Sequence, residues 1–309
     1  MSKHTTGIHH ITAYVGHPQE NVDFYAGVLG LRLVKQTVNF DDPSLYHLYF
    51  GDEYAKPGTI ITFFPVPNGP KGIIGDGQVG VTTYVIPKGS MNFWKERLTK
   101  KGVSFKEVTR FNEDYVQFED THGLRLELVE REEGQPNTWL YEDITPDTAI
   151  KGFGGAILYS LDPQASKDVL ENIMGLEYVS TEGDYQRFKS SADIGNIVDL
   201  KMSTSGLGRM GVGTVHHIAW RANDAKDHVQ WQELVAKSGY NVTPVIDRNY
   251  FDAIYFREPG QILYEIATDT PGFAHDESQE TMGEKLMLPS QYESRRQAIE
   301  DNLIPIKVK

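Results

Sequence analysis

Hydrophobic positions in this chain alternate between two periods: every second residue over short runs, and a helical spacing between those runs. Residues 8–15 (IHHITAYV) predict a strand, and residues 18–31 (PQENVDFYAGVLGL) predict an amphipathic helix that buries Val22, Tyr25 and Val28 and stops at Gly30. Strand-like runs then continue to residues 58–67 (GTIITFFPVP). The first unit is therefore expected to be a strand, a helix and three further strands.

This order of elements recurs four times, with units that begin near Ile8, Val79, Gly154 and Val215, a period of very roughly 60–75 residues. The later units open with VGVTTYVI, FGGAILYS and VHHIAWRA, and each continues into an amphipathic segment, at residues 90–102, 162–179 and 224–240. They close with strand-like runs such as LRLELVE, GNIVDLKMS and QILYEIAT. We interpret the chain as a βαβββ module repeated four times.

A polar segment with Pro and Gly separates the second unit from the third and predicts a linker at the middle of the chain. The expected organisation is an N-terminal domain over 5–130, a linker over 131–151, a C-terminal domain over 152–270 and a tail over 271–309. Residues 290–303 of the tail (SQYESRRQAIEDNL) predict a helix capped by Ser290. The fold class is α+β.

Composition narrows the chemistry. The 309 residues include no Cys, so disulfides, thiolate ligands and cysteine nucleophiles are excluded, and a bound metal would need His and carboxylate ligands. The formal charge of -13 disfavours nucleic acid and anionic membranes, and no long apolar run suggests a leader or a membrane span. We expect a cytoplasmic protein whose partner is a small molecule.

Two histidine pairs distinguish the outer units from the inner ones. His9-His10 lies in the first opening strand and His216-His217 in the fourth, and aligning the strands places Gly80 and Gly155 where His10 and His217 stand. The fold itself therefore does not require imidazoles there, and the repeated placement favours metal ligands. Successive strand residues face opposite sides, so one histidine of each pair faces the site, and periodicity alone does not say which.

Glu265 lies between apolar neighbours in the last strand of unit four, where an unpaired buried carboxylate would cost several kcal/mol as a rough estimate. Aligning Gly58 with Gly260 places Phe63 at the equivalent position of unit one. The count is then two histidines and one carboxylate, which leaves open positions on an octahedral ion and suits iron(II). Manganese or another divalent metal remains an alternative.

The sequence resembles the vicinal oxygen chelate superfamily (glyoxalase, bleomycin resistance and extradiol dioxygenase) through HHIT, VHHIAW and GQILYEI. Residues 7–52 further resemble ring-cleaving dioxygenases that act on hydroquinones and are associated with quinone resistance in bacteria. The resemblance implies two cup-shaped mixed-sheet barrels, and a site shared by ends of the chain implies that modules 1 and 4 pair, as do modules 2 and 3. Glu127 and Asp199 would be acidic remnants in the second cup, which we read as structural.

The resemblance also implies the roles of individual residues. The metal ligands would be His10, His217 and Glu265, with Tyr255 and Arg248 beside the bound phenol and His216 as a further candidate near the metal. Tyr255 would exchange a proton with the substrate and Arg248 would stabilise oxyanion charge. The partners would be a hydroquinone or catechol and O2.

Other functions remain open at this stage. A catechol extradiol dioxygenase would use the same ligands, whereas a glyoxalase-type isomerase with zinc or nickel needs a fourth ligand, against which Phe63 argues. A metal-free protein that binds aromatic compounds or drugs, and a thiol transferase of the fosfomycin type, are weaker alternatives. The exact substrate, the metal, the oligomeric state (a homo-oligomer is not excluded) and the roles of His9 and His47 stay undetermined.

Overall fold

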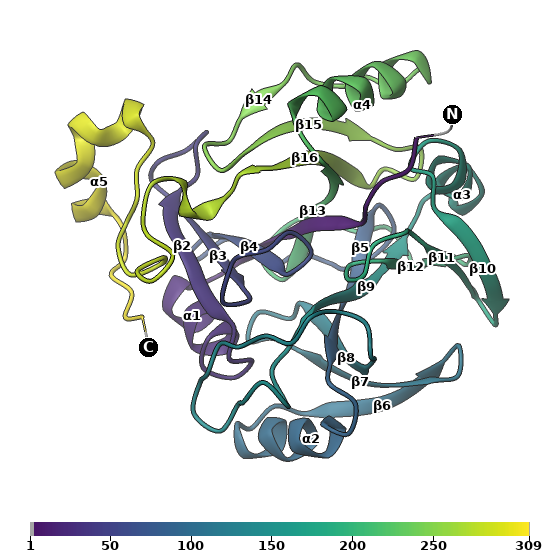
Figure 1. The fold of residues 1–309 in the computed structure, drawn as a ribbon, viewed down its shortest axis with the longest axis horizontal. Helices are drawn as coiled ribbons and strands as arrows, with labels where there is room; N and C mark the ends of the chain where they lie inside the picture. The colour runs from purple at the N-terminus through teal and green to yellow at the C-terminus, as the bar shows by residue number, and fades with distance from the viewer. Residues whose placement is uncertain (1–2, 309) are drawn as a thin grey trace.

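The computed structural model describes residues 3–308 and contains two eight-stranded mixed sheets (Figure 1). From one edge to the other, the strands of the first sheet are ordered β14-β15-β16-β13-β1-β4-β3-β2 and those of the second β10-β11-β12-β9-β5-β8-β7-β6. The first sheet thus joins units one and four, and the second joins units two and three. The predicted α+β class and the predicted pairing of modules are confirmed.

All four units have the predicted element order. Unit one comprises β1 (Ile8–Val15), α1 (Pro18–Tyr25), β2 (Arg32–Val38), β3 (Tyr46–Gly51) and β4 (Ile60–Pro65). Unit two comprises β5 (Gln78–Ile86), α2 (Met91–Lys100), β6 (Phe105–Arg110), β7 (Glu113–Glu119) and β8 (Arg125–Glu130). Unit three comprises β9 (Gly152–Tyr159), α3 (Pro163–Asn172), β10 (Glu177–Glu182), β11 (Tyr185–Lys189) and β12 (Ile197–Lys201). Unit four comprises β13 (Thr214–Ala222), α4 (Ala225–Lys237), β14 (Ile246–Asp247), β15 (Phe251–Arg257) and β16 (Leu263–Pro271).

The central strands are buried on both faces, and most of their residues are accordingly apolar or small. In unit one, Tyr25 of α1 packs against Phe63 and Phe50 on the helix side of the sheet, with ring centroids 4.3 and 5.6 Å apart. In this unit the helix therefore covers one face of the sheet. The opposite face of the same strands points away from the helix.

At the middle of each sheet, the first strands of two units pair with each other. β1 pairs with β13 in antiparallel orientation, and β5 pairs with β9 in the same way. Figure 1 shows β1, in purple at the start of the chain, beside the much later β13. Residues more than 200 positions apart thereby become neighbours at the centre of the first sheet.

The tail after β16 lies against the edge strand β2. Buried Lys35 forms ion pairs with Asp276, at 2.6 Å, and with Glu277, and the amide of Met287 donates to the carbonyl of Gln36. The tail contains the 3-10 segments η1 (Phe273–His275) and η2 (Ser290–Arg295) and the helix α5 (Arg296–Asn302). These contacts cover a strand edge that would otherwise offer unpaired backbone groups.

The predicted role of Ser290 as a helix cap is wrong. Ser290 is the first residue of the 3-10 segment, its side chain makes no capping hydrogen bond, and the α-helix begins only at Arg296. Pro289 precedes it with extended backbone angles, and the first turn then forms the tighter 3-10 geometry. In a separate observation, no helix within residues 3–308 is long and apolar enough to cross a membrane.

Candidate metal centre

His10, His217 and Glu265 meet at the centre of the first sheet. His10 lies on β1 and His217 on β13, while Glu265 lies on β16, the parallel neighbour of β13. His10 Nε2 is 3.3 Å from His217 Nε2 and 3.5 Å from Glu265 Oε2, and His217 Nε2 is 2.8 Å from the same oxygen. The three donor atoms thus form a small triangle, and all three residues are buried.

The triangle has the size that a divalent ion requires. Bonds of about 2.1 Å to nitrogen and oxygen donors place adjacent ligands about 3.0 Å apart on an octahedron. The measured separations of 2.8, 3.3 and 3.5 Å bracket this value. Two imidazoles and one carboxylate are donors that iron(II), manganese and zinc all accept. The residues therefore fit a metal that contacts all three at once.

The carboxylate of Glu265 supports the same conclusion. Both of its oxygens are buried, and within the described chain neither accepts a well-aligned hydrogen bond, although Oε2 lies close to the His217 nitrogen. Burial alone would raise the pKa of Glu265, but attraction to His10 and His217 outweighs it and holds the pKa well below its usual range. An ionised carboxylate without aligned donors is the state expected of a metal ligand.

Each of the two candidate ligand histidines contacts the histidine that precedes it in the sequence. His9 Nδ1 is 2.9 Å from His10 Nδ1, and His216 Nδ1 is 2.7 Å from His217 Nδ1. If each second histidine keeps a lone pair on Nε2 for the metal, its Nδ1 carries the proton and donates it to its neighbour. Sequence periodicity left open which histidine of each pair faces inward, and the structure places the second of each pair there.

His9 and His216 nevertheless differ. His9 is buried, and its ring lies against Phe251. His216 instead lines the cavity beside the metal site and packs edge-on against Tyr14. Burial, reinforced by the neighbouring His217, lowers the pKa of His216 to about 3, so this ring is neutral at ordinary pH. Its Nε2–H is then a donor available to a ligand in the cavity.

The cavity has a volume of about 260 Å³ and is walled mainly by aromatic rings. Its other lining residues are Tyr14, Asn39, Phe40, Asp41, His47, Tyr49, Phe64, His216, Arg248, Phe251 and Tyr255. Arg248 Nε donates to the Tyr255 hydroxyl at 3.2 Å, and Arg248 also pairs with Asp41 at 3.1 Å. Tyr255 and Arg248 therefore both lie at the cavity.

Tyr255 is held in its protonated form. Burial, and after it the negative charge of Glu265 across the β15–β16 ladder, raises the pKa of Tyr255 well above 10, with Arg248 opposing the shift. Because Arg248 donates to its oxygen, the tyrosine hydroxyl proton is left to point elsewhere. The site thus offers one neutral proton donor next to one permanent cation.

His47, whose role the sequence left undetermined, lies at the cavity and is hydrogen-bonded to neighbouring side chains. Its ring lines the cavity, lies between Tyr49 and Phe64 with centroids 4.0 and 4.4 Å away, and is hydrogen-bonded through both nitrogens. The partners are side chains and not the strand backbone: the Tyr49 hydroxyl at Nδ1 and Thr62 Oγ1 at Nε2, each at 2.8 Å. Sequence analysis missed this network, because the alternation of the strand gives its facing residues but not their partners on other strands.

Two alignments made from the sequence are wrong. Glu265 pairs with Ala219, two residues after His217, and Thr62 pairs with Thr12, two residues after His10, so Thr62 and not Phe63 is the counterpart of Glu265. The segment after the glycine is one residue shorter in unit one, which turns Phe63 toward the helix.

The second alignment concerned the counterparts of the histidines. Gly155 is the counterpart of His217, as expected, because it lies opposite Thr83 just as His217 lies opposite Thr12. The counterpart of His10 is Val81 and not Gly80, because the ladder between β5 and β9 has a bulge that skips Gly80, as the ladder between β1 and β13 skips His9.

The second sheet carries arginines where the first would hold a metal. Arg110 binds Glu127 at 2.9 Å and Asp199 at 2.8 Å, and Arg187 binds Asp199 at 2.7 Å. Glu127 pairs with Thr83, two residues after Val81, and Asp199 pairs with Ile157, two residues after Gly155. Glu265 likewise pairs with Ala219, two residues after His217, so the three acids occupy corresponding positions. The charges of Glu127 and Asp199 are balanced by guanidinium groups, in agreement with a structural role.

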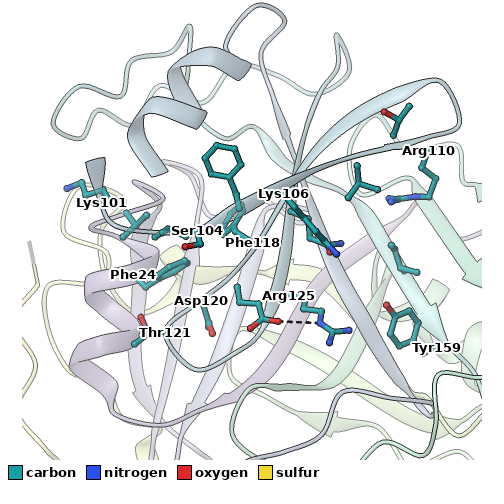
Figure 2. A pocket seen from close by; sticks show the side chains of 18 of the residues that line it. Phe24, Lys101, Ser104, Lys106, Arg110, Phe118, Asp120, Thr121, Arg125 and Tyr159 are labelled. Carbon is teal, nitrogen blue, oxygen red and sulfur yellow. Dashed lines mark hydrogen bonds and ion pairs between the residues drawn. The ribbon is translucent and has the colours of Figure 1, made fainter. Parts of the chain in front are cut away.

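A larger cavity of about 1170 Å³ lies beside this second sheet. Figure 2 shows Phe24 and Phe118 on one side of it and Arg110 and Tyr159 on the other. Its lining includes cations such as Lys106 along with several acids, and it does not include the metal-ligand cluster identified among the described residues. The smaller cavity is therefore the candidate active site.

With this geometry in place, comparison with known proteins assigns the chain to a family. The model of the Glyoxalase/Bleomycin resistance protein/Dioxygenase superfamily matches residues 7–128 and 152–266. The chain belongs to this superfamily, and its two curled sheets have the vicinal oxygen chelate fold.

Individual relatives are more specific. The chain is 67% identical to the "Putative ring-cleaving dioxygenase MhqO" of Bacillus subtilis over 100% of its length and 99% of that protein. It is 33% identical to the "Chlorohydroquinone/hydroquinone 1,2-dioxygenase" of Sphingobium indicum, over 95% of this chain and 94% of that one. A crystal structure of a Bacillus subtilis protein described as a dioxygenase superposes with a TM-score of 0.99 at 66% identity, covering 100% of this chain and 99% of that one.

Proposed function

We propose that this protein is an iron(II)-dependent ring-cleaving dioxygenase that opens hydroquinone-type aromatic rings with O2. One observation carries the proposal: two imidazoles and one carboxylate bring their donor atoms together at the wall of an aromatic-lined cavity. A closed structural zinc site would have four protein ligands. The names of the relatives point to the same reaction class.

The proposed ligands are His10 Nε2, His217 Nε2 and a carboxylate oxygen of Glu265. Iron(II) held in this way would supply open coordination positions at which a phenol oxygen and dioxygen can bind side by side. Manganese or another divalent ion would fit the same donors. His9 and His216 would keep the two ligating rings in the tautomer and orientation that binding requires.

The cavity suits a small uncharged ring. At about 260 Å³ it falls just below the range of about 300–1,000 Å³ typical of ligand pockets, so it favours a single substituted ring. Phe251, whose ring is 4.9 Å from that of His10, and Phe64 would contact the faces of the substrate. A hydroquinone has its second hydroxyl on the far side of the ring, where it does not need to reach the metal.

Tyr255, Arg248 and His216 would handle protons and charge. The Tyr255 hydroxyl, protonated and already accepting from Arg248, is placed to donate to a substrate oxygen. Arg248 would stabilise negative charge as the phenol loses its proton, and the neutral His216 would donate from Nε2. A cytoplasmic role in aromatic catabolism or quinone detoxification, and association into homo-oligomers, are further parts of the proposal.

Oxygen consumption tests the proposal. Protein prepared without oxygen and loaded with iron(II) should consume one O2 per molecule of methylhydroquinone and yield a ring-opened product, and it should turn over catechol more slowly at the same iron loading. Protein loaded with zinc is the matched control, because it keeps the ligands but cannot pass electrons to oxygen. Absence of oxygen uptake by iron-loaded protein with any small phenol would refute the proposal.

A further inference from the structure

The first sheet has an approximate two-fold symmetry that exchanges its two histidine ligands. In the antiparallel β1–β13 pair, His10 lies opposite Ala219 and His217 lies opposite Thr12. β4 runs parallel beside β1, and β16 runs parallel beside β13, with Thr62 next to Thr12 and Glu265 next to Ala219. The rotation that exchanges the two histidines therefore also exchanges Thr62 and Glu265.

This symmetry shows where a fourth protein ligand would come from. Glu265 places Oε2 2.8 Å from the nitrogen of His217, on its own side of the axis, and 3.5 Å from that of His10. A glutamate at position 62 would, by the same rotation, approach His10 most closely and face the same ion. The threonine present there is two atoms too short to do so.

Thr62 lies on the cavity side of its strand. Two residues later Phe64 lines the cavity, and Tyr49, the cross-strand partner of Thr62, lines it as well. Side chains two residues apart in a strand, and cross-strand partners, share one face of a sheet. Phe63, between them, faces the helix, so position 62 and not 63 determines what the first unit offers to the metal.

Hydrogen bonds direct the Thr62 hydroxyl away from the ligands. His47 is hydrogen-bonded to the Tyr49 hydroxyl through Nδ1 and to Thr62 Oγ1 through Nε2, each at 2.8 Å. Thr62 Oγ1 is also hydrogen-bonded to Thr12 Oγ1, at 2.8 Å. The Thr62 hydroxyl therefore has two hydrogen-bond partners that are not metal-ligand candidates, and Thr62 is fully buried.

We propose that Thr62 is the residue that holds the protein's ligand count at three. Its short side chain, fixed by His47 and Thr12, leaves open the coordination position that its symmetry mate Glu265 fills on the other side. The claim about ligand number stands on the register of the strands alone. The claim that this opening serves oxygen and substrate rests on the proposed function.

The test compares Thr62→Glu with Thr62→Gln, two side chains of the same length of which only one is anionic. Calorimetric titration with Mn(II) and Zn(II) should give Thr62→Glu a dissociation constant about tenfold or more below those of the wild type and of Thr62→Gln. With iron(II), Thr62→Glu should also lose most of the oxygen uptake. Equal metal affinity in the folded Glu and Gln variants would overturn the proposal.

The larger side chain needs room, which His47 occupies. If Thr62→Glu does not fold, the double variant Thr62→Glu/His47→Ala is compared with His47→Ala alone, and the same gain in metal affinity is expected. If both glutamate variants are unfolded and added metal does not restore structure, the proposal also fails, because a ligand must be stabilised by its ion. A wild type without oxygen uptake would refute the proposed function but leave the affinity comparison intact.

Discussion

Glu265 is a buried carboxylate that lies against the imidazoles of His10 and His217. Within the described residues its oxygens have no aligned donor, whereas the acids of the second sheet have arginines. Attraction to His10 and His217 keeps the carboxylate ionised, and a bound cation would add the aligned partner that its oxygens lack. At the scale of single residues, the same charge therefore accounts for the proposed metal binding and for the effect that metal should have on stability.

The variant Glu265→Gln tests how this charge contributes to stability and to metal binding. The metal-free variant should be no more stable than the wild type, because the attraction between the carboxylate and the two histidines is lost. Added Mn(II) or Zn(II) should raise the melting temperature of the wild type alone, by an amount equivalent to about 2.7 kcal/mol when the metal is at one hundred times its dissociation constant. Thermal unfolding with and without metal measures this. A variant stabilised by metal as strongly as the wild type would contradict the ligand assignment.

The two supporting histidines should behave differently when replaced. His9→Leu and His216→Leu should each weaken metal binding by about 10–100-fold, because each ligating imidazole loses the partner of its Nδ1. Only His216 lines the cavity, so His216→Leu should lose more oxygen uptake per bound iron than His9→Leu. Uptake is measured at saturating iron. Equal losses per bound iron would remove His216 from the reaction.

At the scale of elements, buried ion pairs tie the strands of the second sheet together. Glu113 on β7 accepts from Arg131 and Arg187, each at 2.6 Å, and from the Tyr115 hydroxyl at 2.7 Å. Burial would raise the pKa of Glu113, but the hydrogen bond and charge of Arg131 and the other donors outweigh it and lower the pKa to about 2. Glu113 therefore links β7 to β11 and to the end of β8.

A depressed carboxyl pKa makes stability depend on pH in a defined window. Glu113 binds a proton more readily in the unfolded chain, near pH 4.5, than in the folded one, near pH 2. Its contribution to stability is complete above pH 4.5 and disappears as pH falls toward 2. The free energy of unfolding, measured by urea titration, should differ between wild type and Glu113→Gln by a constant amount above pH 4.5 and by progressively less below it. A difference that grew on acidification would contradict this assignment.

The elements also show what sequence can and cannot supply. Alternation and helix punctuation predict the order of elements in all four units, because each strand and helix signals its own period locally. The counterpart of Glu265 was misassigned to Phe63, because a loop shorter by one residue reverses the face of every following strand position without changing composition. The bulge at Gly80 is invisible for the same reason, since it arises from pairing with a strand far along the chain.

At the scale of the whole molecule, both sheets are shared between the two halves of the chain. The pairing of unit one with unit four was predictable, because ligands at opposite ends of the sequence need a common site. What sequence could not supply was the contact partners inside the site, such as Asp41 with Arg248 or Thr62 with His47. These pairs join residues on different strands and loops, and their own segments carry no signal of the partner.

The predicted division into segments 5–130 and 152–270 can be tested with fragments. Each segment supplies one strand to the β1–β13 pair and one to the β5–β9 pair, so each half alone would expose the central edges of two sheets. Separately expressed fragments 1–130 and 131–309 should bind metal only after they are mixed or co-expressed. Calorimetry would measure the binding. If either fragment alone bound metal, the site could not be shared between the two halves.

The central claim is that one ion is held by His10, His217 and Glu265 and that the equivalent place in the second sheet holds none. Anomalous diffraction at the iron absorption edge, from crystals loaded with iron(II) under nitrogen, tests it directly. A single peak is expected about 2.1 Å from the two Nε2 atoms and a carboxylate oxygen of Glu265, with no fourth protein donor. A peak between Glu127 and Asp199, or a fourth side chain bound to the ion, would contradict it.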